Sequence, residues 1–227
     1  MLFRSLGGYF VAGIPSLFGL SALYMYLKKI PAAIVSGIVL LISVAALFLT
    51  GCRGSYIGCM VIFAGVFLIS AKFFWNTYKK IYLSFIGGVV VLASAAMLAM
   101  SSLRARVFSI FAMRQDSSNS FRFNVYQSSL QMFKDNWLLG IGVGNKNFRE
   151  IYGLYMRTGF DALSAYNIFL ETAVESGIFA LIAFLIFLVI LVKDAVKYIF
   201  TSSDTKNIIY VSAAVISIIA TMVHGLV

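Results

Sequence analysis

Hydrophobic residues fall into six long runs along the chain, at roughly 8–27, 31–49, 54–74, 81–101, 175–192 and 207–227. Each run is close to the ~20 residues that an α-helix needs to cross the ~30 Å hydrocarbon core of a membrane. A stretch of mixed polarity, 102–163, separates the fourth run from the fifth. The pattern predicts an all-α, polytopic bundle of about six transmembrane helices, with this one large loop outside the bilayer.

The loop 102–163 is expected to contain amphipathic helices. Its segment 121–137 carries five large side chains at helical spacing: Phe123, Tyr126, Leu130, Phe133 and Trp137. Such a helix either lies on the membrane surface or caps the bundle. Three glycines at 140, 142 and 144 then interrupt the pattern, and Asn145 is placed to cap a short helix that follows.

The fifth run belongs to a helix that we expect to begin nearer 164, with Ser164 as its N-cap. Counted to 192, that helix is longer than the bilayer requires, so we expect its first turns to project outward or to break near Gly177. Ser164, Asn167, Glu171 and Glu175 share one face of it, and a polar stripe near a membrane faces protein or water. The two glutamates are then either solvated or paired with loop arginines, or one of them is a catalytic base.

Charge gives the orientation. Eight of the ten lysines lie in three connections, 28–29, 72–80 and 193–206. The positive-inside rule puts those connections in the cytoplasm and the long loop outside. Only 11% of the residues are charged and 61% are hydrophobic, whereas a soluble domain has about a quarter charged residues. The net charge of +10 therefore indicates topology and contact with membrane lipids rather than binding of nucleic acid.

All eight arginines fall on the predicted outer side, six of them within the loop. The planar guanidinium pairs with phosphate or carboxylate in a bidentate way that lysine cannot match. The segregation indicates either headgroup contact at the outer leaflet or an anionic ligand held at the outer face. Arg53, at the turn between the second and third runs, is either an interfacial arginine or a charge at the mouth of a cavity between closely packed helices.

The remaining candidate chemistry is sparse. Cys52 and Cys59 lie seven residues apart, and the chain has one histidine, His224, so we expect no metal site and no cofactor. Histidine is the side chain that carries protons near neutral pH. No cleavable signal peptide is evident. The last run ends without a flanking charge, so we expect residues 1–227 to be a single membrane domain from a longer protein.

Three segments carry a resemblance to a known family: "FRFNVYQSSLQMFKDNWLLGIGVGNKNF", "ALSAYNIFLETAVESGIFAL" and "ATMVHGLV". In order and spacing they resemble the carboxy-terminal half of the O-antigen ligase-like superfamily of polytopic membrane proteins. The resemblance covers roughly 50–227 and is nearest to the branch called putative inorganic-carbon (bicarbonate) transporters. For the ligases it implies transfer of a glycan from undecaprenyl pyrophosphate, without metal, at the outer face of the bacterial cytoplasmic (inner) membrane.

The resemblance also implies roles for particular residues. Arg53, in "GCRGSYIG", matches one of two family arginines that hold the pyrophosphate, and Arg122, in "RFNVY", matches the other. The family's base, a histidine followed by asparagine, falls at Tyr166 beside Asn167. A phenol is a poor general base at neutral pH, so Glu171 or Glu175 would have to replace it. Arg149 and His224 are further candidates for the site.

Three functions compete at this point. The first is transfer or polymerisation of an undecaprenyl-pyrophosphate-linked glycan, which the arginines and the loop favour. The second is a role in inorganic-carbon transport, which predicts ionisable residues at mid-membrane and broken helices. The third is an inactive family member that keeps the fold alone.

Overall fold

The computed structural model describes residues 2–99 and 117–226, and these residues contain helices but no strand. In chain order the helices are α1 (Leu2–Tyr26), α2 (Ile30–Leu49), α3 (Arg53–Ala99), α5 (Ser117–Asp135), α6 (Asn145–Tyr152), α7 (Ile168–Thr201) and α8 (Thr205–His224). Five segments have the length and hydropathy to cross a membrane: 6–26, 30–49, 54–71, 168–201 and 205–224. The predicted all-α membrane architecture is therefore confirmed. The loop arginines 104, 106 and 114 lie outside the described residues.

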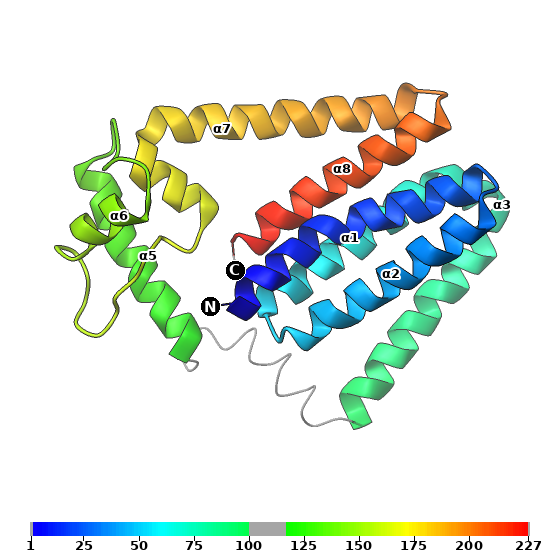
Figure 1. Ribbon diagram of the computed structural model, residues 1–227, viewed down its shortest axis with the longest axis horizontal. Helices are drawn as coiled ribbons and strands as arrows, with labels where there is room; N and C mark the ends of the chain where they lie inside the picture. Colours follow the sequence, from blue (N-terminus) through cyan, green and yellow to red (C-terminus); the bar gives the residue numbers. More distant parts are fainter. Residues whose placement is uncertain (1, 100–116, 227) are drawn as a thin grey trace.

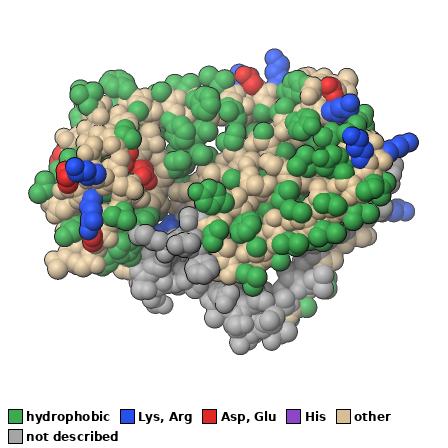
Figure 2. All heavy atoms as spheres, in the orientation of Figure 1, with side chains coloured by type: hydrophobic (Ala, Val, Ile, Leu, Met, Phe, Trp, Pro, Cys, Tyr) green, Lys and Arg blue, Asp and Glu red, His purple; other side chains and the backbone are tan. Residues whose placement is uncertain are grey.

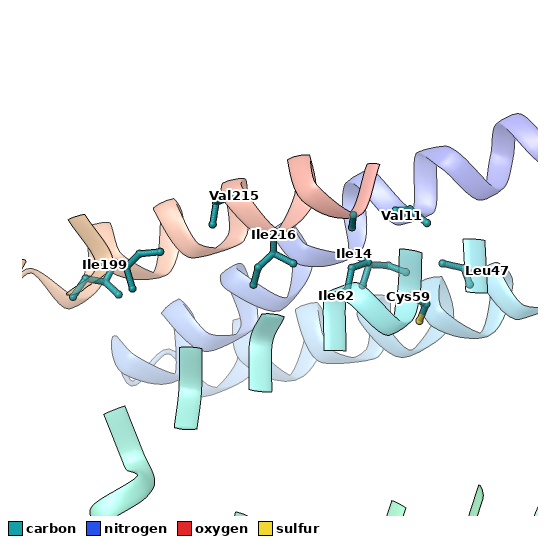
Figure 3. Packing of buried hydrophobic residues seen from close by; sticks show 10 residues of the cluster. Val11, Ile14, Leu47, Cys59, Ile62, Ile199, Val215 and Ile216 are labelled. Atoms are coloured by element: carbon teal, nitrogen blue, oxygen red, sulfur yellow. The ribbon is translucent and has the colours of Figure 1, made fainter. Parts of the chain in front are cut away.

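The first part of α3 packs with α1, α2 and α8 to form the bundle (Figure 1). Figure 3 shows its core, where side chains of all four helices and of the end of α7 meet. Small residues let the helices approach closely, as is usual in membranes. A Cβ at Gly58 of α3 would lie 2.9 Å from Val11 of α1, and one at Gly19 would lie 2.8 Å from Ala213 of α8. Gly58 and Gly19 therefore lie where neighbouring helices of the bundle approach closely.

Helix α3 differs from the expected pair of separate spans. The lysine-containing segment 72–80 is helical, so it forms no connection of its own, and the predicted span 81–101 continues the same helix as far as Ala99. The segment contains neither glycine nor proline, and lysine is a good helix former, so nothing in it stops the helix. In Figure 1 the two parts of α3 nevertheless run in different directions.

The lysine segments gather at one end of the bundle. The α1–α2 turn, the α7–α8 turn and the middle of α3 all lie at the right of Figure 1, while the α2–α3 turn, both termini and α5 lie towards the left. On the face in Figure 2, hydrophobic side chains cover the middle, and lysine and arginine side chains stand out at the two ends. The three lysine segments therefore lie at one end of the bundle, as the sequence predicts, although 72–80 is helical and is not a connection.

A second, smaller core lies at the left-hand end, where α5, α6 and the start of α7 meet. Its fully buried members are Val125, Met132, Phe148, Tyr152, Ala162, Ala165 and Val174. The predicted helix 121–137 is present as α5. Of its regularly spaced side chains, Phe123 and Leu130 are 41% and 47% exposed, whereas Phe133 packs against this core. Trp137, two residues beyond the end of the helix, is 52% exposed. The face that packs on the protein is the one carrying Val125 and Met132.

Helix α7 breaks at Gly177, as expected from its length. Gly177 has φ 80° and ψ −179°, a conformation that essentially only glycine adopts. The break frees backbone groups, and the glycine-containing loop after α5 satisfies them. The amides of Ile141 and Gly142 donate to the carbonyls of Val174 and Glu175, at 2.9 and 3.0 Å, and Ile178 donates to the carbonyl of Trp137 at 2.8 Å.

Candidate functional site

A cavity of about 430 Å³ lies where the bundle meets the smaller core. It is lined by Arg122 of α5, the start of α7 and the end of α8: Arg122, Tyr166, Asn167, Ile168, Glu171, His224 and Gly225. Five of the eight residues singled out from the sequence thus line one cavity, although they come from three separate segments. Such convergence of polar groups in one pocket is typical of a binding or active site.

Arg122 is the cation of this cavity. Its Nη1 is buried and has no hydrogen-bond partner in the described structure. The two other arginines with described side chains differ from it. Arg149 is 60% exposed and pairs with Asp161 at 3.2 Å, and Arg157 donates to Asn124 Oδ1 at 3.0 Å. A buried, unpaired guanidinium nitrogen is costly unless a ligand satisfies it.

The cavity wall at 164–167 is shaped by a turn rather than by a helix. Tyr166 has φ 53°, a left-handed conformation that costs a residue with a side chain about 1–2 kcal/mol. Ser164 Oγ accepts from its amide at 3.2 Å, and the Tyr126 hydroxyl donates to its carbonyl at 3.3 Å. Strained residues of this kind cluster at functional sites.

That turn moves the start of α7. Asn167, not Ser164, is the N-cap, and its side chain accepts from the amides of Phe169 and Leu170 at 3.0 and 3.2 Å. The prediction for Ser164 was wrong because Tyr166 has a left-handed conformation. A right-handed helix cannot include such a residue, so α7 begins only after it. Similarly, Gly144 rather than Asn145 is the N-cap of α6, with φ 113° and no side-chain cap.

Glu171 and Glu175 have different surroundings although they lie one turn apart. Glu171 is half-buried and lines the cavity. No ion pair joins it to Arg122 in the residues described. Glu175 is only 9% exposed and lies outside the cavity lining. Its Oε2 accepts from the Gly144 amide at 3.1 Å, so it holds the glycine-containing loop.

His224, the only histidine of the chain, reaches the cavity from the last turn of α8. Its ring lies beside two glycines: a Cβ at Gly8 would be 3.3 Å from Nε2, and a Cβ at Gly54 would be 3.0 Å from Nδ1. Nδ1 is buried without a partner among the described residues. The sequence drew attention to this histidine, but only the fold reveals that it shares a cavity with Arg122.

The other two candidates are placed as follows. Arg149 lies on α6, exposed and paired with Asp161, and it does not line the cavity. Arg53 is the first residue of α3, next to the Gly54 that contacts His224, but its side chain lies outside the described part. The predicted meeting of Arg53 and Arg122 across a phosphate-sized gap therefore stays a prediction.

Two tyrosines tie the smaller core together. The Tyr152 hydroxyl donates to the carbonyl of Phe160 at 2.8 Å, and burial raises the pKa of Tyr152. The Tyr155 hydroxyl donates to Asp135 Oδ2 at 2.7 Å, and that hydrogen bond raises the pKa of Tyr155. Both phenols thus remain neutral hydrogen-bond donors at physiological pH, which makes them supports of the site rather than proton acceptors.

Comparison with known families agrees with this arrangement. No curated protein shows a significant match to the chain. The family described as O-antigen ligase matches residues 38–185, well over half of the chain, from α2 through the cavity-lining start of α7. This family indicates a membrane protein with a lipid-linked glycan as its substrate. With its spanning helices and its arginine-lined cavity, the chain is a multi-pass membrane protein that belongs to the O-antigen ligase family.

Proposed function

We propose that this protein transfers or polymerises a glycan carried on undecaprenyl pyrophosphate, at the outer face of a bacterial cytoplasmic membrane, with Arg122 contacting the pyrophosphate. The buried, unpartnered Nη1 of Arg122 in the cavity carries the proposal. Guanidinium and phosphate form strong charge-assisted hydrogen bonds. Arg53, at the start of α3, is proposed as the second cation of the same site.

The chemistry follows from the charges. When the glycosidic bond to the pyrophosphate breaks, negative charge develops on the departing phosphate oxygen, and preorganised cations in a site that excludes water stabilise it. The attacking hydroxyl of the acceptor must lose its proton, and positioned bases contribute roughly 10²–10⁴-fold to such steps. Glu171 and His224 both line the cavity, and either side chain is able to take a proton.

Binding of undecaprenyl pyrophosphate to the protein in lipid nanodiscs tests the proposal. Arg122→Ala should weaken binding roughly 10- to 100-fold, the equivalent of about 1.5–3 kcal/mol for hydrogen bonds to a charged group. Arg149→Ala is the matched control, because it removes an exposed arginine outside the cavity, and it should bind like the parent. Equal affinities for the parent and Arg122→Ala would refute the site.

One observation favours transport of inorganic carbon as a second candidate: α7 is broken and a buried glutamate, Glu175, lies near the break. Transporters bind ions at such breaks. Here, however, the loop amides of 141 and 142 already occupy the carbonyls of 174 and 175, and Glu175 accepts from Gly144. Bicarbonate uptake by proteoliposomes that is lost in Glu175→Gln would favour transport over transfer.

A further inference from the structure

We propose that a groove between α1, α3 and α8 binds one anionic glycerophospholipid, at the end of the bundle where the lysines gather. The inference goes beyond the proposed glycan transfer and does not depend on it. The groove is a cavity of about 680 Å³, within the range of about 300–1,000 Å³ that is typical of ligand pockets. It is separate from the cavity that contains Arg122, because the two have no lining residue in common.

The groove lies in the half of the bundle nearest the lysine segments. Helix α8 lines it from Thr205 to Ile216, and α1 lines it from Pro15 to Tyr26. These are the first half of α8 and the second half of α1, and the turns beside them lie at the same end of the bundle (Figure 1). The positive-inside rule puts this end in the cytoplasm. The groove therefore belongs to the cytoplasmic leaflet, whereas the cavity with Arg122 lies at the other end.

The wall of the groove is mostly apolar. Phe18 of α1, Ile69 of α3 and Ile216 of α8 contribute to it, and the large side chains of Met25 and Phe73 in the same wall are exposed. Packed helices leave few voids larger than a water molecule, and water does not fill an apolar cavity. In a membrane, the hydrocarbon chain of a lipid is the content that such a wall favours.

Basic side chains flank the groove. Lys28 follows the last lining residue of α1 by two positions, and Lys206 directly follows the first lining residue of α8. Both are exposed, and neither forms an ion pair within the part of the chain that the structure describes. The three lysine segments together hold eight lysines and two aspartates, and one of these, Asp204, already accepts hydrogen bonds from the start of α8. Basic pockets of this kind, between helices on the cytoplasmic side, bind anionic lipid headgroups.

One polar atom in the wall lacks a partner. Ser212 is only 8% exposed, it lines the groove, and its Oγ has no hydrogen-bond partner among the described residues. Other hydroxyls in these helices are satisfied: Ser70, in the same wall, donates to the carbonyl of Phe67 at 3.1 Å, and Ser21 donates to that of Leu17 at 2.9 Å. A buried hydroxyl without a partner is costly. We therefore expect the occupant of the groove to supply an acceptor.

An anionic glycerophospholipid supplies all three groups. Its acyl chain fills the apolar wall, its phosphate lies near the lysines, and the ester carbonyls between phosphate and chains accept from Ser212. A polyprenyl chain carries no polar atom along its length, so it would leave the hydroxyl unsatisfied. A further transmembrane helix satisfies its own backbone and brings no phosphate to the lysines. The phospholipid is thus the occupant that the observations favour.

Lipid binding to the purified full chain in detergent, measured by native mass spectrometry, tests the headgroup contacts. Phosphatidylglycerol should bind more tightly than phosphatidylcholine with the same acyl chains. Lys28→Gln combined with Lys206→Gln should weaken phosphatidylglycerol binding roughly five-fold for each lysine removed. Lys134→Gln combined with Lys146→Gln removes two exposed lysines beside the smaller core, and this matched control should bind like the parent. Equal binding of the two lipids, or equal effects of the two double variants, overturns the proposal.

Three further variants test the groove itself. Ala22→Phe adds a ring to the wall and should weaken phosphatidylglycerol binding at least ten-fold, whereas Ala45→Phe, exposed on α2 and outside the lining, should not. Ser212→Ala should weaken binding about 2- to 10-fold, as expected for one hydrogen bond. Parent-like binding by Ser212→Ala overturns the proposal. Displacement of the phospholipid by an equal concentration of undecaprenyl phosphate does so too, because it would assign the groove to a polyprenyl chain. None of these variants changes the cavity that contains Arg122, so the proposed function is tested separately.

Discussion

At the scale of single residues, Glu171 and Glu175 have different roles: Glu171 lines the candidate site, and Glu175 supports a loop beside it. The sequence places both glutamates on one helical face, and by that criterion alone they are equivalent. The structure distinguishes them by their partners: Glu171 lines the cavity, and Glu175 accepts a hydrogen bond from the backbone of a loop. The loop's return to α7 joins residues that are 31 positions apart, and no periodicity along the chain carries that information.

This difference is measurable as stability. We expect Glu175→Ala to lower the free energy of unfolding by about 1–3 kcal/mol, because the Gly144 amide loses its partner. Glu171→Ala serves as the comparison, since Glu171 holds no loop backbone, and it should change the unfolding free energy much less. Unfolding of both variants in nanodiscs, followed by circular dichroism, makes the measurement. A larger loss for Glu171→Ala than for Glu175→Ala would contradict the structural role given to Glu175.

At the scale of elements, the contact between the broken α7 and the glycine-containing loop is the feature that positions the cavity. The break itself could be predicted, because a helix from 164 to 192 exceeds the thickness of a bilayer and contains one glycine near the expected surface. The loop that packs against the break could not be predicted. A Cβ at Gly177 would lie 2.3 Å from the carbonyl oxygen of Leu138, and one at Gly140 would lie 2.4 Å from the backbone of Glu175. In the sequence, such backbone-to-backbone contacts appear only as isolated glycines, which do not indicate the segment that each one contacts.

Two glycine variants distinguish backbone strain from this steric contact. Gly159 has φ 89° and nothing within 4 Å of a built Cβ, whereas Gly177 has φ 80° and the close carbonyl of Leu138. Gly159→Ala should therefore lower the free energy of unfolding only by the cost of a left-handed alanine, about 1–2 kcal/mol. Gly177→Ala should lower the free energy of unfolding clearly more, and it should expose the segment 137–144 to proteolysis. Similar unfolding free energies and cleavage rates for the two variants would show that the loop is not held against the break.

At the scale of the whole molecule, hydrophobic runs and lysine positions predicted most of the architecture, because membrane thickness and charge constrain every span. The exception is α3, which is one continuous helix. The lysines of 72–80 were interpreted as a connection between two spans, but nothing in that segment stops a helix. The candidate site was less predictable. Arg122 and Tyr166 came from resemblance to a family, and the meeting of Arg122 with His224 depends on how α5 and α8 pack. The sequence gives no signal for that packing.

The arrangement of the ends leads to a prediction for the protein in cells. All three lysine segments lie at one end of the bundle and the cavity at the other, so the positive-inside rule puts the cavity outside the cytoplasm. Both Cys52 and Cys59 are first changed to serine, and single cysteines are then introduced at two exposed positions, Thr158 beside the smaller core and Ser203 in the α7–α8 turn. In intact cells a membrane-impermeant maleimide should label Thr158→Cys and not Ser203→Cys, whereas both should react once the membrane is opened. Labelling of Ser203→Cys alone would invert the topology, and it would place the pyrophosphate site on the side where a ligase acting on exported glycans could not use it.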